Sequence, residues 1–562
     1  MKLARTSNLI LFLALTFFCF PAILEAQTRP IVITGGTLID GTGRPPLTDT
    51  AIVIHEGRIR EVGKRGEISL PQGAEVIEVK GKTVLPGLID GHCHYRDWMG
   101  EIYLAFGVTT CPDISNNPTE WIISQRDGLQ KGKIRGPRVW AVGNVLDGPP
   151  PPGMGGQRRQ RGSIMVRTPE EARETVRALV AKGVDGLKFY ERLAPTVAKA
   201  AADEAHRLGR PVIGHSLDIF AAAEAGYQSV EHSWAILYTS IQDPKKKAQL
   251  DMARMKGEVN TAEVHVHMEP EMFERIIKVM VEKNVHWSPA WGTWFRALSP
   301  RAEKMKEREI ALLKEPRFRY LPAYILEVAQ GHFAMYENAP AEKRTQLMEG
   351  YKKVQEFTRR FVAAGGKVHS GSDPNSLLAG YGVHAELQLL IDAGLSAVQA
   401  IQSASWNVAQ AWGKEKDYGS VEKGKVADIV IVRGDPLRDI WATQDVEMVF
   451  MDGKPVDISP NPDYRNPIPR PLPDRFVPTL SELSPRSLTE ASAGRVKLSG
   501  SGFRPTHQVL LNGRKVESRF INSKELEVHI PGVEAGTYKI SVVDPGIATS
   551  ESNWLFLVVS FR

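Results

Sequence analysis

The sequence has little cysteine and little excess of either charge. Its 562 residues include three cysteines, too few for a disulfide scaffold, a four-cysteine zinc site or an iron–sulfur cluster. Lysine and arginine number 71 against 65 acidic residues, a net charge of +6. A nucleic-acid binder needs clustered basic residues, so no nucleic-acid partner is expected. The chain is 42% apolar and 24% charged, which is typical of globular proteins and excludes disordered, collagen-like and coiled-coil chains.

Long apolar runs are also scarce. The run Leu9–Leu24 has 16 residues, fewer than the roughly 20 that a membrane-spanning helix needs. It follows a basic start and predicts a secretory signal peptide ending at Ala26, with an uncleaved anchor as the alternative. We expect a periplasmic or secreted protein without stable membrane insertion. The mature chain would keep Cys93 and Cys111, and the sequence leaves their pairing open.

Periodicity divides the chain into strand-rich ends and a long alternating middle. The middle contains eight apolar segments that alternate with helical stretches, which predicts an α/β fold with a (β/α)8 TIM barrel. The eight segments are Val84–Ile89, Ala105–Thr110, Arg138–Val142, Gly186–Phe189, Val212–Ile213, Ser229–Val230, Val285–Ser288 and Lys367–His369. The predicted units are a signal peptide (1–26), a small β-sandwich in two parts (27–84 and 416–458), the barrel (85–415), a proline-rich, extended linker (459–478) and a last β-sandwich (479–562).

Long loops follow three of the predicted barrel strands. Two span about 233–268 and 292–350, and long loops on this side of a barrel usually serve as lids or specificity walls. The third contains Arg158, Arg159 and Arg161. These arginines fit either a solvated loop or the attraction of an anionic substrate.

Polar residues stand where the predicted barrel strands end, and barrel chemistry is located there. His92 and His94 close the first strand, and side chains two apart on a strand point to the same face. The pair His265 and His267 lies in a polar insertion instead. Later strands contribute Lys188, His215, His232 and Asp373. A buried lysine is costly unless it is paired or modified. Together these residues predict a metal centre.

Several segments resemble the amidohydrolase superfamily, most closely its imidazolonepropionase-like and prolidase-like branch. The resemblance covers residues 30–457 and rests on Leu85–His94, Gly107–Thr110, Gly136–Arg138 and Gly419–Asp428. It implies a barrel flanked by a small β-sandwich that both ends of the barrel region build.

The resemblance also implies the roles of the residues. One metal ion would be held by His92, His94 and Asp373, a second by His215 and His232, and a carboxylated Lys188 would bridge the two. An unmodified ammonium group has no lone pair for a metal. Zinc is the default for imidazole and carboxylate ligands, with manganese, cobalt or nickel as alternatives. Metal-activated hydroxide would attack a carbonyl carbon, with Asp373 as the base. Imidazolonepropionases lack the lysine, which argues against that activity.

Substrate contacts are less defined. Arg96 has the spacing of an arginine that binds a substrate carboxylate in dihydroorotase-like members, or it pairs with Asp97. Tyr190 faces the site or packs, and His384 begins a helix near the eighth strand. Three tryptophans wall the pocket or pack in the core, namely Trp287, Trp291 and Trp294.

The C-terminal residues resemble an IPT/TIG immunoglobulin-like domain. The matching pieces include Leu498–Phe503, Val509–Gly513 and Gly536–Tyr538. Roles as a spacer, a cell-surface or glycan contact and a lid all remain open, as does homo-oligomerisation.

These observations predict an exported binuclear metal-dependent amidohydrolase that cleaves a carbon–nitrogen bond of a dipeptide or N-acyl amino acid. The alternatives are a cyclic amidohydrolase of the dihydroorotase or hydantoinase kind, a lactone or ester hydrolase, and a catalytically silent surface binding protein.

Overall fold

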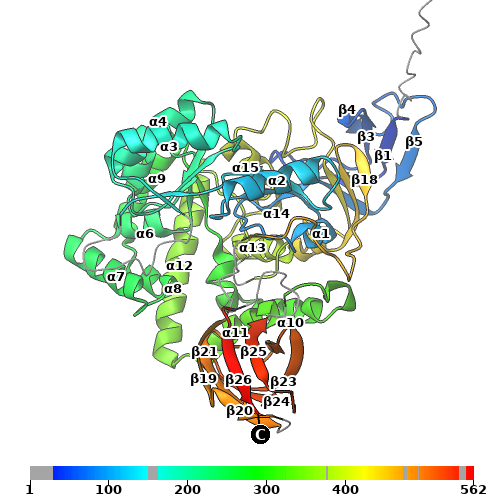
Figure 1. Cartoon of the computed structure of the whole chain (residues 1–562). Helices are drawn as coiled ribbons and strands as arrows, with labels where there is room; N and C mark the ends of the chain where they lie inside the picture. The colour runs from blue at the N-terminus through cyan, green and yellow to red at the C-terminus, as the bar shows by residue number, and fades with distance from the viewer. Residues whose placement is uncertain are drawn as a thin grey trace, which may run out of the picture.

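A computed structural model describes residues 29–149, 163–322, 324–374, 377–471, 478–490, 493–543 and 552–561. The predicted signal peptide and the three loop arginines, Arg158, Arg159 and Arg161, lie outside the described residues. The chain forms a central barrel, a small sandwich beside it and a C-terminal β-domain next to α10 and α11 (Figure 1). No helix in the described ranges has the length and apolarity needed to cross a membrane.

The predicted (β/α)8 barrel is confirmed. Its parallel strands are β7 (Leu88–Ile89), β8 (Val108–Asp113), β9 (Arg138–Ala141), β12 (Leu187–Phe189), β13 (Val212–Gly214), β14 (Ser229–Glu231) and β15 (His286–Ser288). The eighth position is a short segment that bridges Trp287 through Val368. The N–H of Gly91 donates to the Ser370 carbonyl at 2.9 Å, which joins the eighth position to the first and closes the barrel. Two short strands, β10 (Leu146–Asp147) and β11 (Ile164–Met165), extend the sheet beside β12.

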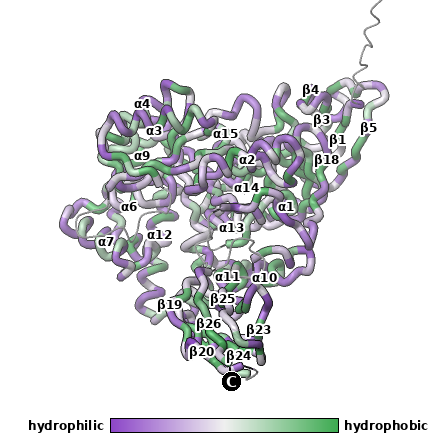
Figure 2. The backbone as a smooth tube through the Cα atoms, viewed as in Figure 1, coloured by the Kyte–Doolittle hydropathy of each residue, from purple (hydrophilic) through white to green (hydrophobic). Residues whose placement is uncertain are grey.

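Helices surround these strands. Those between barrel strands are α1 (Gly100–Ala105), α2 (Thr119–Gln130), α3 (Pro169–Ala181), α4 (Pro195–Arg207), α5 (Ile219–Ala225), α9 (Phe273–Glu282) and α12 (Ala341–Ala363), followed by α13 (Tyr381–Asp392), α14 (Ala397–Ser403) and α15 (Trp406–Ala411). Helix α3 begins where the Thr168 side chain accepts the Glu171 N–H and proline fills the first helical position. Helix α7 (Pro244–Lys256) is mainly hydrophilic (Figure 2).

Two predicted strands were wrong at their ends. The apolar run Val84–Ile89 divides at Gly87, because β6 (Lys82–Pro86) pairs antiparallel with β16 (Ile429–Arg433) in the small sandwich. The barrel keeps only the two residues of β7. In the second case Ala105 ends helix α1, Gly107 turns the chain at φ +72°, and the strand starts at Val108.

Both ends of the barrel region build the small sandwich. One sheet has the order β4-β3-β1-β5, and the other has the order β18-β17-β16-β6-β2. The remaining members are β1 (Ile31–Thr34), β2 (Thr37–Leu38), β3 (Thr50–His55), β4 (Arg58–Lys64), β5 (Glu75–Glu78), β17 (Val446–Met451) and β18 (Lys454–Val456). Their buried side chains form one hydrophobic cluster, so neither part is a complete unit without the other.

Helical insertions follow β14 and β15, where long loops were predicted. The first carries α6 (Trp234–Ser240), α7 (Pro244–Lys256) and α8 (Thr261–Val264). The second carries α10 (Ala302–Leu313) and α11 (Tyr324–Glu337) before α12.

The proline-rich segment packs on the barrel over its described residues, 459–471. Asn466 donates to the Asp97 carbonyl at 3.1 Å, the Gln125 amide donates to the Ile468 carbonyl at 2.6 Å, and Arg470 Nε donates to Asn117 at 2.6 Å. The segment is therefore attached beside the loop that follows β7.

The C-terminal domain is a β-sandwich with its own hydrophobic cluster. Its strands are β19 (Thr479–Ser484), β20 (Ser487–Thr489), β21 (Gly494–Ser501), β22 (Gln508–Leu511), β23 (Arg514–Asn522), β24 (Glu525–Ile530), β25 (Gly536–Val543) and β26 (Leu555–Ser560). Thr506 donates to Glu327 of α11 at 3.0 Å, and Arg504 lies 3.5 Å from the same carboxylate.

Candidate metal centre

The predicted metal ligands converge at the carboxyl ends of the barrel strands. Two sets of three side chains each place one donor atom per residue within 4.8 Å of the others. One set is His92, His94 and Asp373, which is the predicted first site. The other is His92, His215 and His232, so His92 belongs to both sets.

The donor atoms of this cluster fit metal ions. Several are buried and have no hydrogen-bond partner among the described residues: His92 Nε2, both ring nitrogens of His215, His232 Nδ1 and Lys188 Nζ. A buried polar atom without a partner costs about 1–3 kcal/mol. Burial, followed by nearby cationic groups, holds the pKa of each histidine well below its ordinary value. These shifts favour the neutral imidazoles that metal ligation requires.

Asp373 lies between two of the histidines. Its two carboxylate oxygens are 3.4 Å from His94 Nε2 and 3.8 Å from His232 Nε2, respectively. The backbone at Asp373 has φ +41° and at His232 φ +59°, a left-handed conformation that non-glycine residues rarely adopt. The N–H of Asp373 donates to the His92 carbonyl at 2.8 Å. The fold thus holds both residues in conformations that direct their side chains into the cluster.

A buried carboxylate also anchors the residue before Asp373. Asp90 accepts hydrogen bonds from the Ser372 N–H at 2.7 Å and the Tyr103 hydroxyl at 3.0 Å. Burial raises the pKa of Asp90 to about 6, although these hydrogen bonds act in the opposite direction. Asp90 therefore fixes the start of the loop that carries Asp373.

Glu231 orients His92 and was missed by the sequence analysis. Its Oε2 lies 2.5 Å from His92 Nδ1, and its Oε1 accepts the Ser229 hydroxyl at 2.8 Å. A carboxylate that accepts a hydrogen bond from Nδ1–H keeps the proton on that nitrogen, so the lone pair of Nε2 is available to a metal. The signal in the sequence was an acidic residue, Glu231, within a barrel strand and directly before the predicted ligand His232.

Replacing Glu231 with glutamine should lower metal affinity about 10- to 100-fold, because the neutral amide no longer fixes the His92 tautomer. Competition with a chromogenic chelator measures this effect. Glu170, which is exposed on α3, supplies the control Glu170→Gln. Equal affinity in the Glu231 and control variants would contradict the assigned role.

Lys188 lies in the same buried cluster. Its ammonium group is screened from solvent, and burial lowers its pKa to about 8 against the opposing pull of Glu231, Asp373 and Asp113. Its Nζ has no hydrogen-bond partner in the described part of the chain. This position suits a group that is modified rather than one that is ion-paired.

Two predicted substrate contacts lie at the cluster. The Tyr190 ring is centred 4.5 Å from the His215 ring. Arg96 donates to the carbonyls of His94 at 3.2 Å and Tyr95 at 2.9 Å. No ion pair between Arg96 and Asp97 is present in the described ranges, so that predicted alternative was wrong.

The predicted substrate role of His384 was also wrong. Its Nδ1 lies 2.8 Å from the Thr443 hydroxyl and its Nε2 lies 3.0 Å from the Phe106 carbonyl. Both nitrogens are therefore engaged by elements outside the ligand cluster. The histidine faces α1 and the small sandwich, because helix α13 turns this side chain away from the barrel mouth.

The three tryptophans of the predicted wall have different roles. Trp287 and Trp291 are fully buried, and Trp287 donates its indole N–H to the His232 carbonyl at 2.6 Å. Trp294 is partly exposed, and its ring is centred 4.7 Å from that of His232. Only Trp294 of the three covers the ligand cluster.

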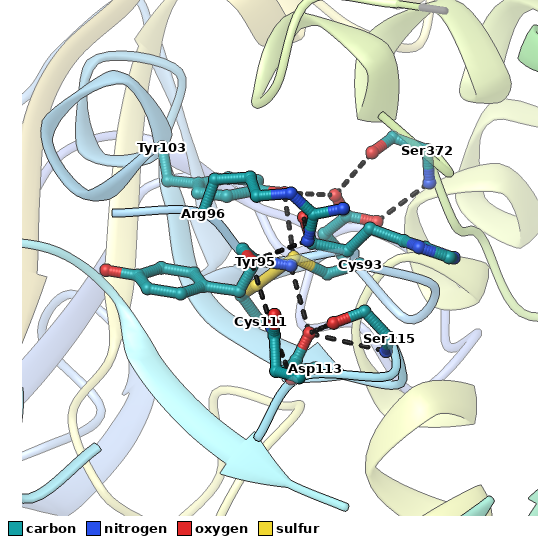
Figure 3. The surroundings of a disulfide bond; sticks show 11 residues. Cys93, Tyr95, Arg96, Tyr103, Cys111, Asp113, Ser115 and Ser372 are labelled. Carbon is teal, nitrogen blue, oxygen red and sulfur yellow. Dashed lines mark hydrogen bonds between the residues drawn. A yellow bond between two sulfur atoms is a disulfide. The ribbon is translucent and has the colours of Figure 1, made fainter. Parts of the chain in front are cut away.

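A disulfide joins Cys93, which lies between two metal-ligand candidates, to Cys111 of β8 (Figure 3). The Cα atoms are 6.0 Å apart. This bond settles the pairing that the sequence left open, and it fastens the His92–His94 segment to the neighbouring strand.

Removal of this disulfide should destabilise the protein. The cysteines are 18 residues apart, and closing a loop of that size is worth about 3 kcal/mol. Urea unfolding of a Cys93→Ser/Cys111→Ser variant measures the difference. The wild type after full reduction should match the variant. Equal stability of oxidised and reduced wild type would show that the bond contributes nothing.

Comparisons with known proteins identify the family of this chain. The model of the amidohydrolase family matches residues 83–456. The chain belongs to the amidohydrolase family. The model of the IPT/TIG domain matches residues 478–557, which confirms the prediction for the C-terminal sandwich.

Curated relatives match this amidohydrolase over short segments. A dihydroorotase of Acetivibrio thermocellus is 42% identical over 71 residues, 12% of this chain and 15% of the relative. A 5-methylthioadenosine/S-adenosylhomocysteine deaminase of Symbiobacterium thermophilum is 37% identical over 65 residues, which are 11% of this chain and 15% of the relative. The chain thus matches less than a fifth of each relative's length.

Solved structures share the fold over longer stretches. A Xaa-Pro dipeptidase with bound methionine superposes with a TM-score of 0.54 and 22% identity, covering 76% of this chain and 100% of that one. Molinate hydrolase superposes with a TM-score of 0.53 and 20% identity, covering 77% and 95%. A protein of Bifidobacterium longum described as a candidate prolidase superposes with a TM-score of 0.56 and 22% identity, covering 79% of this chain and 98% of that one.

Proposed function

We propose that this amidohydrolase is an exported, binuclear metal-dependent enzyme that hydrolyses the amide bond of a dipeptide or N-acyl amino acid. The observation that carries the proposal is the pair of overlapping donor sets that share His92, with the unpartnered Lys188 amine beside them. A catalytically silent binding protein would have no need to keep these buried, costly groups together.

His92, His94 and Asp373 would hold one divalent ion, and His215 and His232 the other. Zinc suits this imidazole and carboxylate set best, and manganese, cobalt and nickel are alternatives. Divalent ions bound here supply Lewis acidity, which lowers the pKa of water toward about 7 and polarises a substrate carbonyl.

Asp373 is the proton carrier in this proposal. Its carboxylate sits between His94 and His232, where it accepts the proton of the attacking water and returns it to the leaving nitrogen. The Trp294 and Tyr190 rings cover His232 and His215 and would exclude bulk water from the bond that breaks.

Lys188 would act as a carbamate. Its neutral amine adds to carbon dioxide, one proton leaves, and the product is a negatively charged group with two acceptor oxygens. That group can ligate both ions, which an ammonium group cannot do. The metal ions would be the partners of that group, whereas the unmodified amine has no hydrogen-bond partner among the described residues.

A cyclic amide is the second candidate substrate. The sequence similarity to a dihydroorotase and the position of Arg96 beside His94 favour it. Guanidinium binds a carboxylate in a bidentate manner, so Arg96 suits a cyclic amide that carries a ring carboxylate, as dihydroorotate does. Lactones and esters remain further alternatives.

Export is supported by the disulfide. Such bonds persist in oxidising compartments and are rare in the cytosol, and the bond between Cys93 and Cys111 is buried. A periplasmic or secreted location agrees with the apolar N-terminal run. The Ig-like domain would then face a cell surface or glycans.

The test is a mass-spectrometric screen of the metal-loaded mature protein against dipeptides, N-acyl amino acids and cyclic amides. Release of a free amino acid, absent in an Asp373→Ala control, would support the proposal. Ring opening of cyclic amides alone would move the assignment to the second candidate. No turnover of any amide by protein that holds two metal ions would refute both.

A further inference from the structure

The segment that follows β15 passes beside the metal centre and is held by a carboxylate from another helix. It contains the 3-10 turn η4 (Trp291–Thr293). Glu386 of α13 accepts the N–H of Trp291 on Oε1 at 3.0 Å and the N–H of Gly292 on Oε2 at 2.9 Å. Glu386 is fully buried, and no lysine or arginine in the described ranges forms an ion pair with it.

Burial of the Glu386 carboxyl group costs free energy that an apolar side chain in a purely structural contact would not. A buried carboxyl group is unfavourable unless its oxygens accept hydrogen bonds, and an apolar side chain could fill the same space without that cost. Both oxygens of Glu386 are used on one turn, so the turn is fixed in position and orientation. Gly292 leaves room for the neighbouring Leu377 side chain, because a Cβ there would lie 2.7 Å from Leu377 Cδ2.

The other end of η4 reaches the ligand cluster. The Thr293 hydroxyl lies 3.4 Å from Asp373 Oδ2 and 3.4 Å from the Asp373 carbonyl oxygen. The next residue, Trp294, packs its ring on His232. One short turn therefore carries both the contact to the candidate base and the partly exposed tryptophan at the site.

We propose that Thr293 and Glu386 are positioning residues of this enzyme. Glu386 fixes η4, and η4 places the Thr293 hydroxyl where it donates to the Asp373 carboxylate and holds it toward the two histidines. The inference rests on the proposed function only in taking Asp373 as a metal ligand and base. Neither residue needs to touch substrate.

The first test compares Thr293→Val with Thr293→Ser. Valine keeps the shape and removes the donor, so we expect kcat to fall about 10-fold with KM within twofold, and metal to be lost at about 10-fold lower chelator concentration. Serine keeps the hydroxyl and should restore both quantities to within about threefold of wild type. Thr358 is buried in α12, and its hydroxyl donates to the Val354 carbonyl at 2.8 Å. Thr358→Val is therefore the matched control and should leave both quantities unchanged.

The second test is Glu386→Gln. An amide has a single acceptor oxygen, so one of the two N–H groups loses its partner and η4 loosens. We expect lower kcat and weaker metal retention, as in Thr293→Val, and no additional loss in the double variant, because both changes act on one contact.

The outcomes separate this inference from the proposed function. Wild-type kcat and metal retention in Thr293→Val would overturn it, and so would a serine variant no better than the valine variant. Metal retention is measured without substrate. If the wild type hydrolyses no amide but Thr293→Val still loses metal more easily than Thr293→Ser, the positioning role stands and the proposed function fails.

Discussion

An Asp373→Asn variant is expected to hydrolyse amides at least about 10³-fold more slowly than the wild type. The side-chain oxygen of asparagine still has a lone pair for a metal, but the amide cannot accept the proton of the attacking water at neutral pH. The loss should therefore appear in kcat rather than in KM. Steady-state rates of the metal-loaded variant, with metal content measured on the same sample, check this prediction.

The control for Asp373→Asn is Asp463→Asn. Asp463 is exposed and pairs with Arg319 at 2.7 Å, so its loss should change kcat less than twofold. Activity near the wild-type level in an Asp373→Asn variant that keeps its metal would remove Asp373 from the role of base. A variant that has lost its metal would indicate that ligation, rather than proton transfer, is the main task of this residue.

Replacement of Lys188 by alanine is expected to remove the second metal ion and lower kcat by about 10³-fold or more. In the wild type, the intact mass should exceed the sequence mass by one carbon dioxide under gentle ionisation. Added acetate or propionate should partly restore activity to Lys188→Ala, because a small carboxylate can occupy the cavity and supply the missing oxygens. Elemental analysis counts the ions in each protein.

Lys199→Ala serves as the control for Lys188→Ala. Lys199 is exposed on α4 and pairs with Asp203 at 2.9 Å, so its replacement should leave two ions and full activity. Two tightly bound ions in Lys188→Ala, or a wild type whose metal binding is independent of bicarbonate, would exclude the carbamate.

The sequence located the ligand cluster because its signal is local. His92, His215 and His232 each follow a predicted barrel strand, and the carboxyl ends of parallel strands in a barrel meet at one face. The convergence of these side chains follows from strand periodicity alone. The same reasoning predicted the barrel, with errors at strand ends where Gly87 and Gly107 turn the chain.

The residues that support the cluster could not be predicted in this way. Glu231 and His92 are 139 residues apart, and Glu386 and Trp291 are 95 residues apart. Neither pair has a periodic signal, because each contact depends on how separate elements pack. The prediction for His384 was wrong for the same reason. Its position near the eighth strand in the sequence did not reveal that α13 directs its side chain toward Thr443 and Phe106.

The proline-rich segment changes where this protein divides. By sequence the barrel and its small sandwich end near residue 458, but Asn466 and Arg470 hydrogen-bond to Asp97 and Asn117, beside the loop that follows β7. A catalytic fragment that ends at residue 471 keeps these contacts, whereas one that ends at residue 458 exposes the surface they cover. A fusion that replaces the Ig-like domain by another module should therefore be joined after residue 471. The proline-rich segment 459–471 then stays with the hydrolase domain.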